Sequence, residues 1–169
     1  GIGIMLDAFA RSEVKHHLLF MGNGPLLLDI ETAVRKCPRI HCRNSVPPSE
    51  ILRYVAGADI GLSLIEDVSL SYRYCLPNKL FESLLAGLPV LVSDLPDQTE
   101  IVRSHQGGWV VELNVNSVVQ FLKTLTRQEA IALRKELPLR VSDLRWENEA
   151  AELISIYSKI KTSPSKKNN

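Results

Sequence analysis

A short helical pattern between residues 76 and 90 carries the side chains best suited to binding a ligand. At about 100° per residue, one side of this helix is apolar and the other is polar. The polar side consists of Asn78, Lys79, Glu82 and Ser83. Pro77 suits the first helical turn and Gly87 the end of the helix, so Asn78 and Lys79 are expected at its exposed N-terminus. Unpaired N–H groups and the helix dipole attract anions there, which favours phosphate as a ligand.

Two readings of Lys79 and Glu82 remain open at this point. In one, they form a solvated ion pair on an ordinary amphipathic helix, worth roughly 0.2–0.5 kcal/mol. In the other, they belong to a ligand site, because a loop rich in Ser and Tyr (residues 69–74) leads into the helix and a second polar loop (residues 93–97) follows the next strand. Both loops would lie at the carboxyl edge of a parallel sheet, where open α/β sheets bind ligands.

The composition fits one α/β domain of 169 residues, since 45% of the residues are hydrophobic and 23% are charged. A net charge of +1, without a basic stripe, argues against nucleic acid as a partner. Cys37, Cys42 and Cys75 lack zinc or redox spacing and are interpreted as reduced thiols. No apolar run could span a bilayer and no signal peptide pattern opens the chain, so a cytoplasmic location is expected. Peripheral association with the inner face of the membrane stays open.

Helical and strand patterns alternate along the chain, which predicts a Rossmann-like open parallel sheet with helices on both faces and further helices at the C-terminal end. Strands are expected at residues 17–21, 39–43, 59–64, 89–93 and 109–111. Further helices are expected at residues 4–11, 26–36, 49–58 with Ser49 as N-cap, 98–105, 113–125 and 146–160. Residues 1–160 are predicted to form the domain, and residues 161–169 a polar, disordered tail.

The patterns around the other polar residues indicate structural roles and not ligand binding. The Gly-Asn-Gly stretch at residues 22–24 favours a plain turn after a strand over a phosphate-binding loop, because one short glycine pair is weak evidence. The four histidines are scattered, and none has ligand spacing with Asp or Glu on one helix, so no metal site is predicted. Asp94 and Asp97 are interpreted as turn and N-cap residues.

The order of several short motifs resembles a known family. These motifs are Phe20-Met21-Gly22-Asn23-Gly24-Pro25, Val46-Pro47 with Glu50-Ile51-Leu52, Ala58-Asp59-Ile60-Gly61-Leu62, Pro77-Asn78-Lys79-Leu80-Phe81-Glu82, Ala86-Gly87-Leu88-Pro89-Val90 and Glu100-Ile101-Val102. Together they resemble the C-terminal, donor-binding domain of GT-B glycosyltransferases of the large retaining family 4, over nearly the whole chain. Trp146-Glu147 is also similar to the start of the last helix of these enzymes, which crosses back towards the N-terminal domain.

The resemblance implies a nucleotide-sugar site with Lys79 and Glu82 as its catalytic candidates. In such enzymes the glutamate at the position of Glu82 hydrogen-bonds the ribose hydroxyls of the donor, and a lysine near the helix start, here Lys79, faces the diphosphate. Their chemistry agrees, because a carboxylate accepts from two vicinal hydroxyls and an ammonium beside helix N–H groups neutralises a diphosphate. Asn78 and Tyr74 are assigned to the same donor site. By resemblance, Arg43 or its neighbours up to Val46, at the end of the second strand, are assigned to the base.

Two features depart from the family pattern. An acid often precedes the helical glutamate by about two turns, in the loop that touches the transferred sugar, and Tyr74 stands in its place. A phenol can bond a sugar hydroxyl but carries no carboxylate charge. By resemblance, the first strand of the domain, the basic residues of its first loop and the acceptor-binding N-terminal domain are expected before Gly1. This piece alone is therefore expected to bind a donor weakly and to transfer nothing. Arg73 is a further candidate for the departing diphosphate.

The expected function is retaining transfer of a hexosyl group from a nucleoside diphosphate sugar, with UDP as the first choice, to a saccharide or lipid-linked acceptor in polysaccharide or glycoconjugate synthesis. No cofactor and no metal are expected, because by resemblance the helix dipole and basic side chains replace a metal ion. Two alternatives remain: half of a nucleotide-sugar epimerase, or a non-catalytic, degenerate donor-binding module. Epimer formation or hydrolysis without acceptor would favour the first, and absence of donor binding the second.

Overall fold

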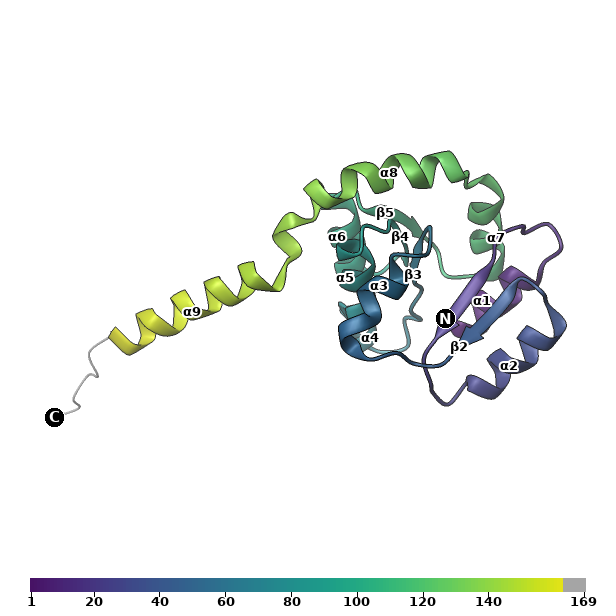
Figure 1. The fold of residues 1–169 in the computed structure, drawn as a ribbon, viewed down its shortest axis with the longest axis horizontal. Helices are drawn as coiled ribbons and strands as arrows, with labels where there is room; N and C mark the ends of the chain where they lie inside the picture. The colour runs from purple at the N-terminus through teal and green to yellow at the C-terminus, as the bar shows by residue number, and fades with distance from the viewer. Residues whose placement is uncertain (163–169) are drawn as a thin grey trace.

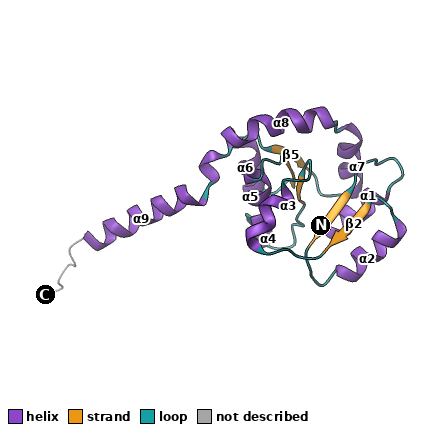
Figure 2. Ribbon diagram, in the orientation of Figure 1, coloured by secondary structure: helices purple, strands orange, loops and turns teal. Residues whose placement is uncertain are grey.

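The strands of the protein coincide with the expected apolar runs and pair in parallel (Figures 1 and 2). The structure is a computed structural model and describes residues 1–162. The strands are β1 (Leu18–Met21), β2 (Ile40–Arg43), β3 (Gly61–Ser63), β4 (Val90–Ser93) and β5 (Gly108–Val111). β4 is buried along its whole length, as is usual for a central strand of a parallel sheet covered by helices.

Helices alternate with strands up to β5 and continue alone after it, as the sequence predicts. They are α1 (Ile2–Ala10), α2 (Leu27–Lys36), α3 (Ile51–Val55), α4 (Leu70–Arg73), α5 (Asn78–Leu85), α6 (Pro96–Ser104), α7 (Val115–Thr124), α8 (Arg127–Arg140) and α9 (Trp146–Thr162). Two 3-10 helices, η1 (Pro48–Glu50) and η2 (Ser142–Leu144), precede α3 and α9. α8 opens with a capping box between Thr126 and Glu129, which satisfies two backbone N–H groups.

The strand pairing differs in one respect from the single sheet that was expected. β1 and β2 form one parallel sheet, and β3, β4 and β5 form another in that order. β1 and β3 are not paired with each other, so side chains join the two sheets in place of a backbone ladder. A shared apolar cluster contains Leu18 of β1, Leu91 of β4 and Val111 of β5.

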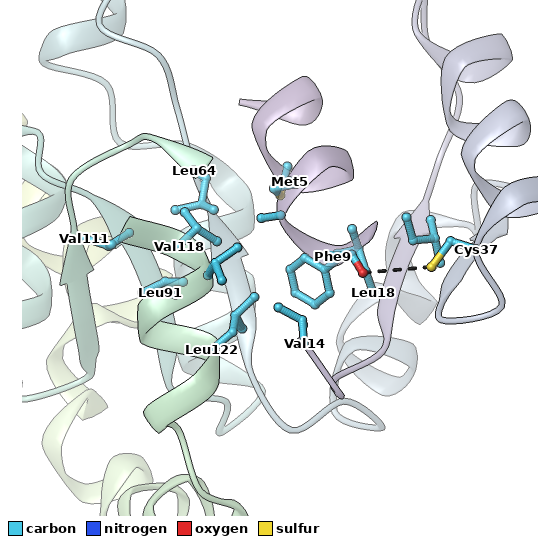
Figure 3. Close-up of a cluster of buried hydrophobic side chains, with 13 residues drawn as sticks. Met5, Phe9, Val14, Leu18, Cys37, Leu64, Leu91, Val111, Val118 and Leu122 are labelled. Carbon is cyan, nitrogen blue, oxygen red and sulfur yellow. Dashed lines mark hydrogen bonds between the residues drawn. The ribbon is translucent and has the colours of Figure 1, made fainter. Parts of the chain in front are cut away.

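α1 and α7 close this shared cluster (Figure 3). Met5 and Phe9 of α1 lie in it together with Val118 and Leu122 of α7. The thiol of Cys37 also lies at its edge and is 3.9 Å from the carbonyl oxygen of Phe9. The two helices therefore fasten the β1-β2 sheet to the β3-β4-β5 sheet.

A second apolar cluster lies on the other face of β4. It contains Val90 and Val92 of this strand, Leu80 and Leu84 of α5, and Leu137 of α8. Successive residues of a strand point to opposite faces of the sheet. Leu91 of β4 lies in the first cluster, whereas its neighbours Val90 and Val92 lie in the second, so both faces of the sheet are covered at β4. The predicted α/β arrangement with helices on both faces is confirmed.

Three local predictions are wrong. Ser49 lies inside η1, and α3 starts later, at Ile51, without a side-chain cap. Asp97 lies in the first turn of α6, where its charge suits the helix dipole, but Leu95 is the N-cap. Residues 70–73, expected as loop, form the short helix α4 because the Ser69 hydroxyl accepts a hydrogen bond from the Tyr72 N–H.

The turn after α6 contains a residue in an unfavourable backbone conformation. Gln106 has a φ of 47°, in the left-handed region that residues with a Cβ avoid. It follows His105, the C-cap of α6, and so stands where glycine is most common. Arg140 donates to its carbonyl oxygen at 3.2 Å, which ties this turn to the end of α8.

α9 extends away from the two sheets (Figure 1). Its exposed apolar side chains are Trp146, Leu153, Ile154, Ile156, Tyr157 and Ile160. The helix is described to Thr162, two residues beyond the expected domain boundary. Residues 163–169 of the expected tail lie outside the described residues. Within residues 1–162, no helix combines the length and apolar character needed to cross a bilayer.

Candidate functional site

The N-terminus of α5 presents backbone N–H groups that no side chain caps. The helix begins at Asn78, directly after its N-cap Pro77, whose ψ of 148° is extended. Proline can hold this position but cannot supply the hydroxyl or carboxylate that usually accepts from the first N–H groups. The N-terminal end of α5 therefore attracts anions, at the position that the sequence predicts.

Lys79 lies in the first turn of α5 with its charge partly shielded from water. It is exposed as a residue, yet burial of the ammonium lowers its pKa, while the nearby thiol of Cys75 acts in the opposite direction. A partly desolvated ammonium interacts more strongly with an anion than one surrounded by water. Lys79 is therefore suited to bind a diphosphate group.

Glu82 is half-buried one turn after Lys79. The ion pairs among residues 1–162 include neither Lys79 nor Glu82. The solvated Lys79–Glu82 ion pair, one of the two readings left open by the sequence, is thus not formed. The Glu82 carboxylate keeps its acceptor oxygens available for hydroxyl groups of a ligand.

Ser83 does not belong to the exposed polar face, contrary to the sequence prediction. It is buried, and its hydroxyl donates to the carbonyl oxygen of Lys79 at 2.7 Å. It packs so closely on β3 that a Cβ at Gly61 would overlap the Ser83 hydroxyl. Serine bonds back to the preceding turn when water is excluded, so periodicity alone misplaces it.

Arg73 and Tyr74, in the segment before α5, differ in their contacts. Arg73 donates to both carboxylate oxygens of Asp67 at distances from 2.6 to 3.2 Å, and this hydrogen bonding raises its pKa. Its guanidinium is engaged within the loop, which disfavours the role at a departing diphosphate expected above. Tyr74 follows α4 as its C-cap, with an exposed side chain, and lies four residues before Asn78.

Arg43 is distant in sequence from the other predicted site residues, which lie in and just before α5. It is the last residue of β2, exposed, and so belongs to the other sheet. The loops that follow β1 and β2 approach each other, since the Asn23 amide donates to the Ser45 hydroxyl at 3.3 Å. Tyr74, Asn78, Lys79 and Glu82 therefore lie on one stretch of chain, from the C-cap of α4 through α5, whereas Arg43 lies at the carboxyl end of a strand of the other sheet.

Two hollows in the surface lie elsewhere. One, of about 490 Å³, is formed by α1, α2 and the start of β2, and the other, of about 620 Å³, by α6, β5 and α8. Neither is lined by the predicted site residues. Tyr74, Asn78 and Lys79 are exposed in this chain, so the candidate site is an open face.

The described residues offer no cluster of three or more His, Cys, Asp or Glu side chains that could hold a metal ion. Asp94 accepts a hydrogen bond from Thr99 at 3.3 Å. His17, directly before β1, stacks on His41 of β2, and the two rings share a 2.8 Å hydrogen bond. The expectation of metal-free binding stays a prediction.

Sequence reasoning missed a buried polar group at the carboxyl ends of β3 and β4. It consists of Ser63, Ser93, Gln98 and Thr99. Ser63 bonds Gln98, and Ser93 bonds Ile65, across separations of 35 and 28 residues. Residues so far apart leave no local periodicity, so only the folded structure identifies them.

Comparison with known proteins agrees with this architecture. Residues 1–128 match the family model of glycosyl transferases group 1. A curated relative, glucosyltransferase 3 of Streptococcus parasanguinis, is 28% identical over 100 residues, which cover 58% of this chain and 30% of that protein. The crystal structure of WaaG, described as a glycosyltransferase involved in lipopolysaccharide biosynthesis, matches with a TM-score of 0.65 and 15% identity. That match covers 86% of this chain and 40% of WaaG.

The chain thus spans well under half the length of both proteins. The match to WaaG supports a GT-B-like fold, with parallel strands flanked by helices, and the family model matches about three quarters of the chain. This chain is therefore a GT-B domain that belongs to the glycosyl transferases group 1 family.

Proposed function

We propose that this chain is the donor-binding domain of a glycosyltransferase and that α5 binds the nucleoside diphosphate of the sugar donor. The observation on which this rests is the uncapped N-terminus of α5, with Lys79 partly desolvated and Glu82 without an ion pair one turn later. Diphosphate and ribose are the two ligand groups that match an ammonium beside free N–H groups and a neighbouring carboxylate.

The donor is a UDP-sugar, and the transferred group a hexose. The relative named a glucosyltransferase supports a glucosyl donor. Tyr74, which precedes α5, contacts the sugar, and Arg43 contacts the base. Lys79 and the helix N-terminus stabilise the departing diphosphate by fixed positive charge, without a metal ion. Transfer proceeds with retention of the anomeric configuration.

The acceptor is a saccharide or a lipid-linked saccharide, held by a further domain of the full-length protein. The WaaG match supports an acceptor of the glycoconjugate type. We place the protein in the cytoplasm, peripherally associated with the inner face of the membrane.

The test is donor use by the full-length protein. UDP-glucose, UDP-galactose, GDP-mannose and ADP-glucose are offered separately with a saccharide acceptor, and product configuration is read by NMR. Glu82→Gln should lower kcat/KM for the UDP-sugar about ten- to hundredfold while the fold stays intact, because it removes a charged acceptor from the ribose hydroxyls. Glu31→Gln, an exposed carboxylate on α2, is the matched control.

Unchanged kcat/KM in Glu82→Gln would remove this residue from the site. Formation of an epimer without acceptor would favour the epimerase alternative. Failure of the full-length protein to bind any of the four donors would favour the non-catalytic module.

A further inference from the structure

The loop after β3 is fastened to β4 by one buried hydroxyl. The Ser93 Oγ accepts from the Ile65 N–H at 2.5 Å and donates to the Ile65 carbonyl oxygen at 2.8 Å. Ser93 is the last residue of β4 and is 1% exposed. The ladder of β3 on β4 ends with the pair Ser63 and Val92, so the hydroxyl takes the place of the next backbone hydrogen bonds.

A second buried contact holds the chain two residues earlier. The Ser63 hydroxyl donates to the Gln98 side-chain oxygen at 2.5 Å, and Gln98 is 0% exposed. Leu64, between the two contacts, lies in the first apolar cluster. Three successive residues are thus fixed by α6, by the core and by β4.

Beyond Ile65, the hydrogen bonds described for residues 66–76 join the segment to itself. Asp67 binds Arg73, and Ser69 caps α4. A segment bonded mainly within itself moves as one unit about its fixed ends. Those ends are Ile65 and Pro77, the N-cap of α5.

We infer that Ser93 is a positioning residue of the donor site. Its hydroxyl fixes Ile65, and through it the segment that presents Tyr74 and leads into Asn78. This inference rests on the proposed function. It assigns no contact between Ser93 and the donor, since the hydroxyl is buried and occupied by Ile65.

Hydrogen exchange of this chain tests, without any ligand, whether the hydrogen bonds between Ser93 and Ile65 restrain the segment. In Ser93→Ala, amides of residues 65–76 should exchange about three- to tenfold faster relative to those of α7, because one hydroxyl no longer holds the segment. Ser104→Ala, which removes an exposed hydroxyl from α6, is the control and should leave the ratio unchanged. A uniform acceleration in all elements would overturn the inference.

Kinetics of the full-length protein test the positioning. In Ser93→Ala, the KM for the UDP-sugar should rise about three- to tenfold with kcat changed less than twofold. Ser93→Thr keeps the hydroxyl on a residue suited to a strand and should restore KM. A fall in kcat alone, or no rescue by threonine, would overturn the role.

If Ser93→Ala does not fold, Ser93→Cys replaces it, since a thiol of similar shape is a weak hydrogen-bond partner. Wild-type exchange and KM in Ser93→Cys would then overturn the inference. If the full-length protein uses no nucleotide sugar, the proposed function fails, whereas the exchange ratio still decides whether Ser93 holds the segment.

Discussion

Lys79 combines a positive charge, partial desolvation and a place in the first turn of a helix whose N-terminus no side chain caps. These three features act on the same ligand group, because each favours an anion at the end of α5. The helical pattern of the sequence predicts the position of Lys79 and Glu82, since 3.6-residue periodicity is strong over residues 78–85. It misplaces Ser83, whose burial depends on the close approach of Gly61.

Replacing Lys79 by alanine should weaken diphosphate binding more than nucleoside binding. In the full-length protein, Lys79→Ala should lower the affinity for UDP about tenfold and that for uridine less than twofold, because the ammonium is aimed at phosphate. Titration of the variant with both ligands measures the difference. Lys135→Ala on α8 is the control. Equal losses for UDP and uridine would mean that Lys79 acts through the structure.

Replacing Gln106 by glycine should stabilise this chain by about 0.5–1 kcal/mol. The substitution removes the cost of a Cβ at a φ of 47°, while the carbonyl oxygen that accepts from Arg140 is kept. Urea unfolding of the chain gives the free energy. Gln106→Ala, which keeps the Cβ, should bring no gain. An equal gain from alanine would assign the effect to the side chain instead.

Among the secondary-structure elements, η2 links α9 to α6 by side-chain contacts. His105 of the α6 C-cap contacts Asp143 of η2 at 3.0 Å, and the Asn148 amide of α9 donates to the Ser142 carbonyl oxygen at 3.0 Å. Desolvation opposes the charge of His105, but hydrogen bonds to Asp143 and to the Ile101 carbonyl outweigh it and raise the His105 pKa. The bond to His105 lowers the Asp143 pKa.

The free energy of unfolding should therefore depend on pH through this pair. The raised pKa of His105 gives stability that is fully present below its ordinary value of 6.5 and is lost as the pH rises through the raised value. The lowered pKa of Asp143 gives stability that is present above 3.8 and is lost as the pH falls through the lowered value. The contribution is largest between these limits and amounts to about 0.2–1 kcal/mol, since Asp143 is mostly exposed.

Asp143→Asn tests this dependence. The stability difference between wild type and variant, measured by urea unfolding, should be larger at pH 5.5 than at pH 8.5. Asp59→Asn, an exposed carboxylate, is the control and should show no such change. A difference that stays constant with pH would remove the ion pair as its cause.

Element prediction succeeds where apolar periodicity is long and fails where a few polar contacts decide. All five strands and the helices α1, α2, α5, α6, α7 and α9 lie where the sequence places them within a few residues. α8 (Arg127–Arg140) falls in the region expected to be helical, but no helix with these bounds was expected. Ser49 and Asp97 precede helical patterns and yet cap nothing, because prolines at positions 48 and 96 already set the first turns. α4 depends on Ser69 and on the bond between Asp67 and Arg73, and is too short for a periodic pattern.

For the whole molecule, the proposed metal-free site has consequences for activity. With fixed positive charge from Lys79 and α5, full-length transferase activity should survive EDTA. It should also fall as ionic strength rises, because exposed charges are screened over about 8–10 Å at physiological salt. The assay compares EDTA-treated and manganese-supplied enzyme across a salt series. Loss of activity in EDTA with rescue by manganese would refute the metal-free site and direct attention to Asp94 and Asp97.

The division into two sheets could not be read from the sequence. Each strand pattern specifies an apolar run, and nothing in such a run states which strand lies beside it. Pairing of β3 with β4 and β5 follows chain order, and so does pairing of β1 with β2. The junction between the sheets depends on packing between α1 and α7, which lie more than 100 residues apart.

That long-range packing has a consequence for synthesis on the ribosome. Met5 and Phe9 are synthesised before their partners Val118 and Leu122, which follow only after more than 100 further residues. At a translation rate of roughly 5–20 residues per second, these apolar side chains stay uncovered for on the order of 5–20 s before α7 can pack on them. Exposed apolar surface on a nascent chain invites aggregation or chaperone binding during that time. Pausing of translation between α1 and α7 should therefore lower the yield of folded protein more than pausing after α7.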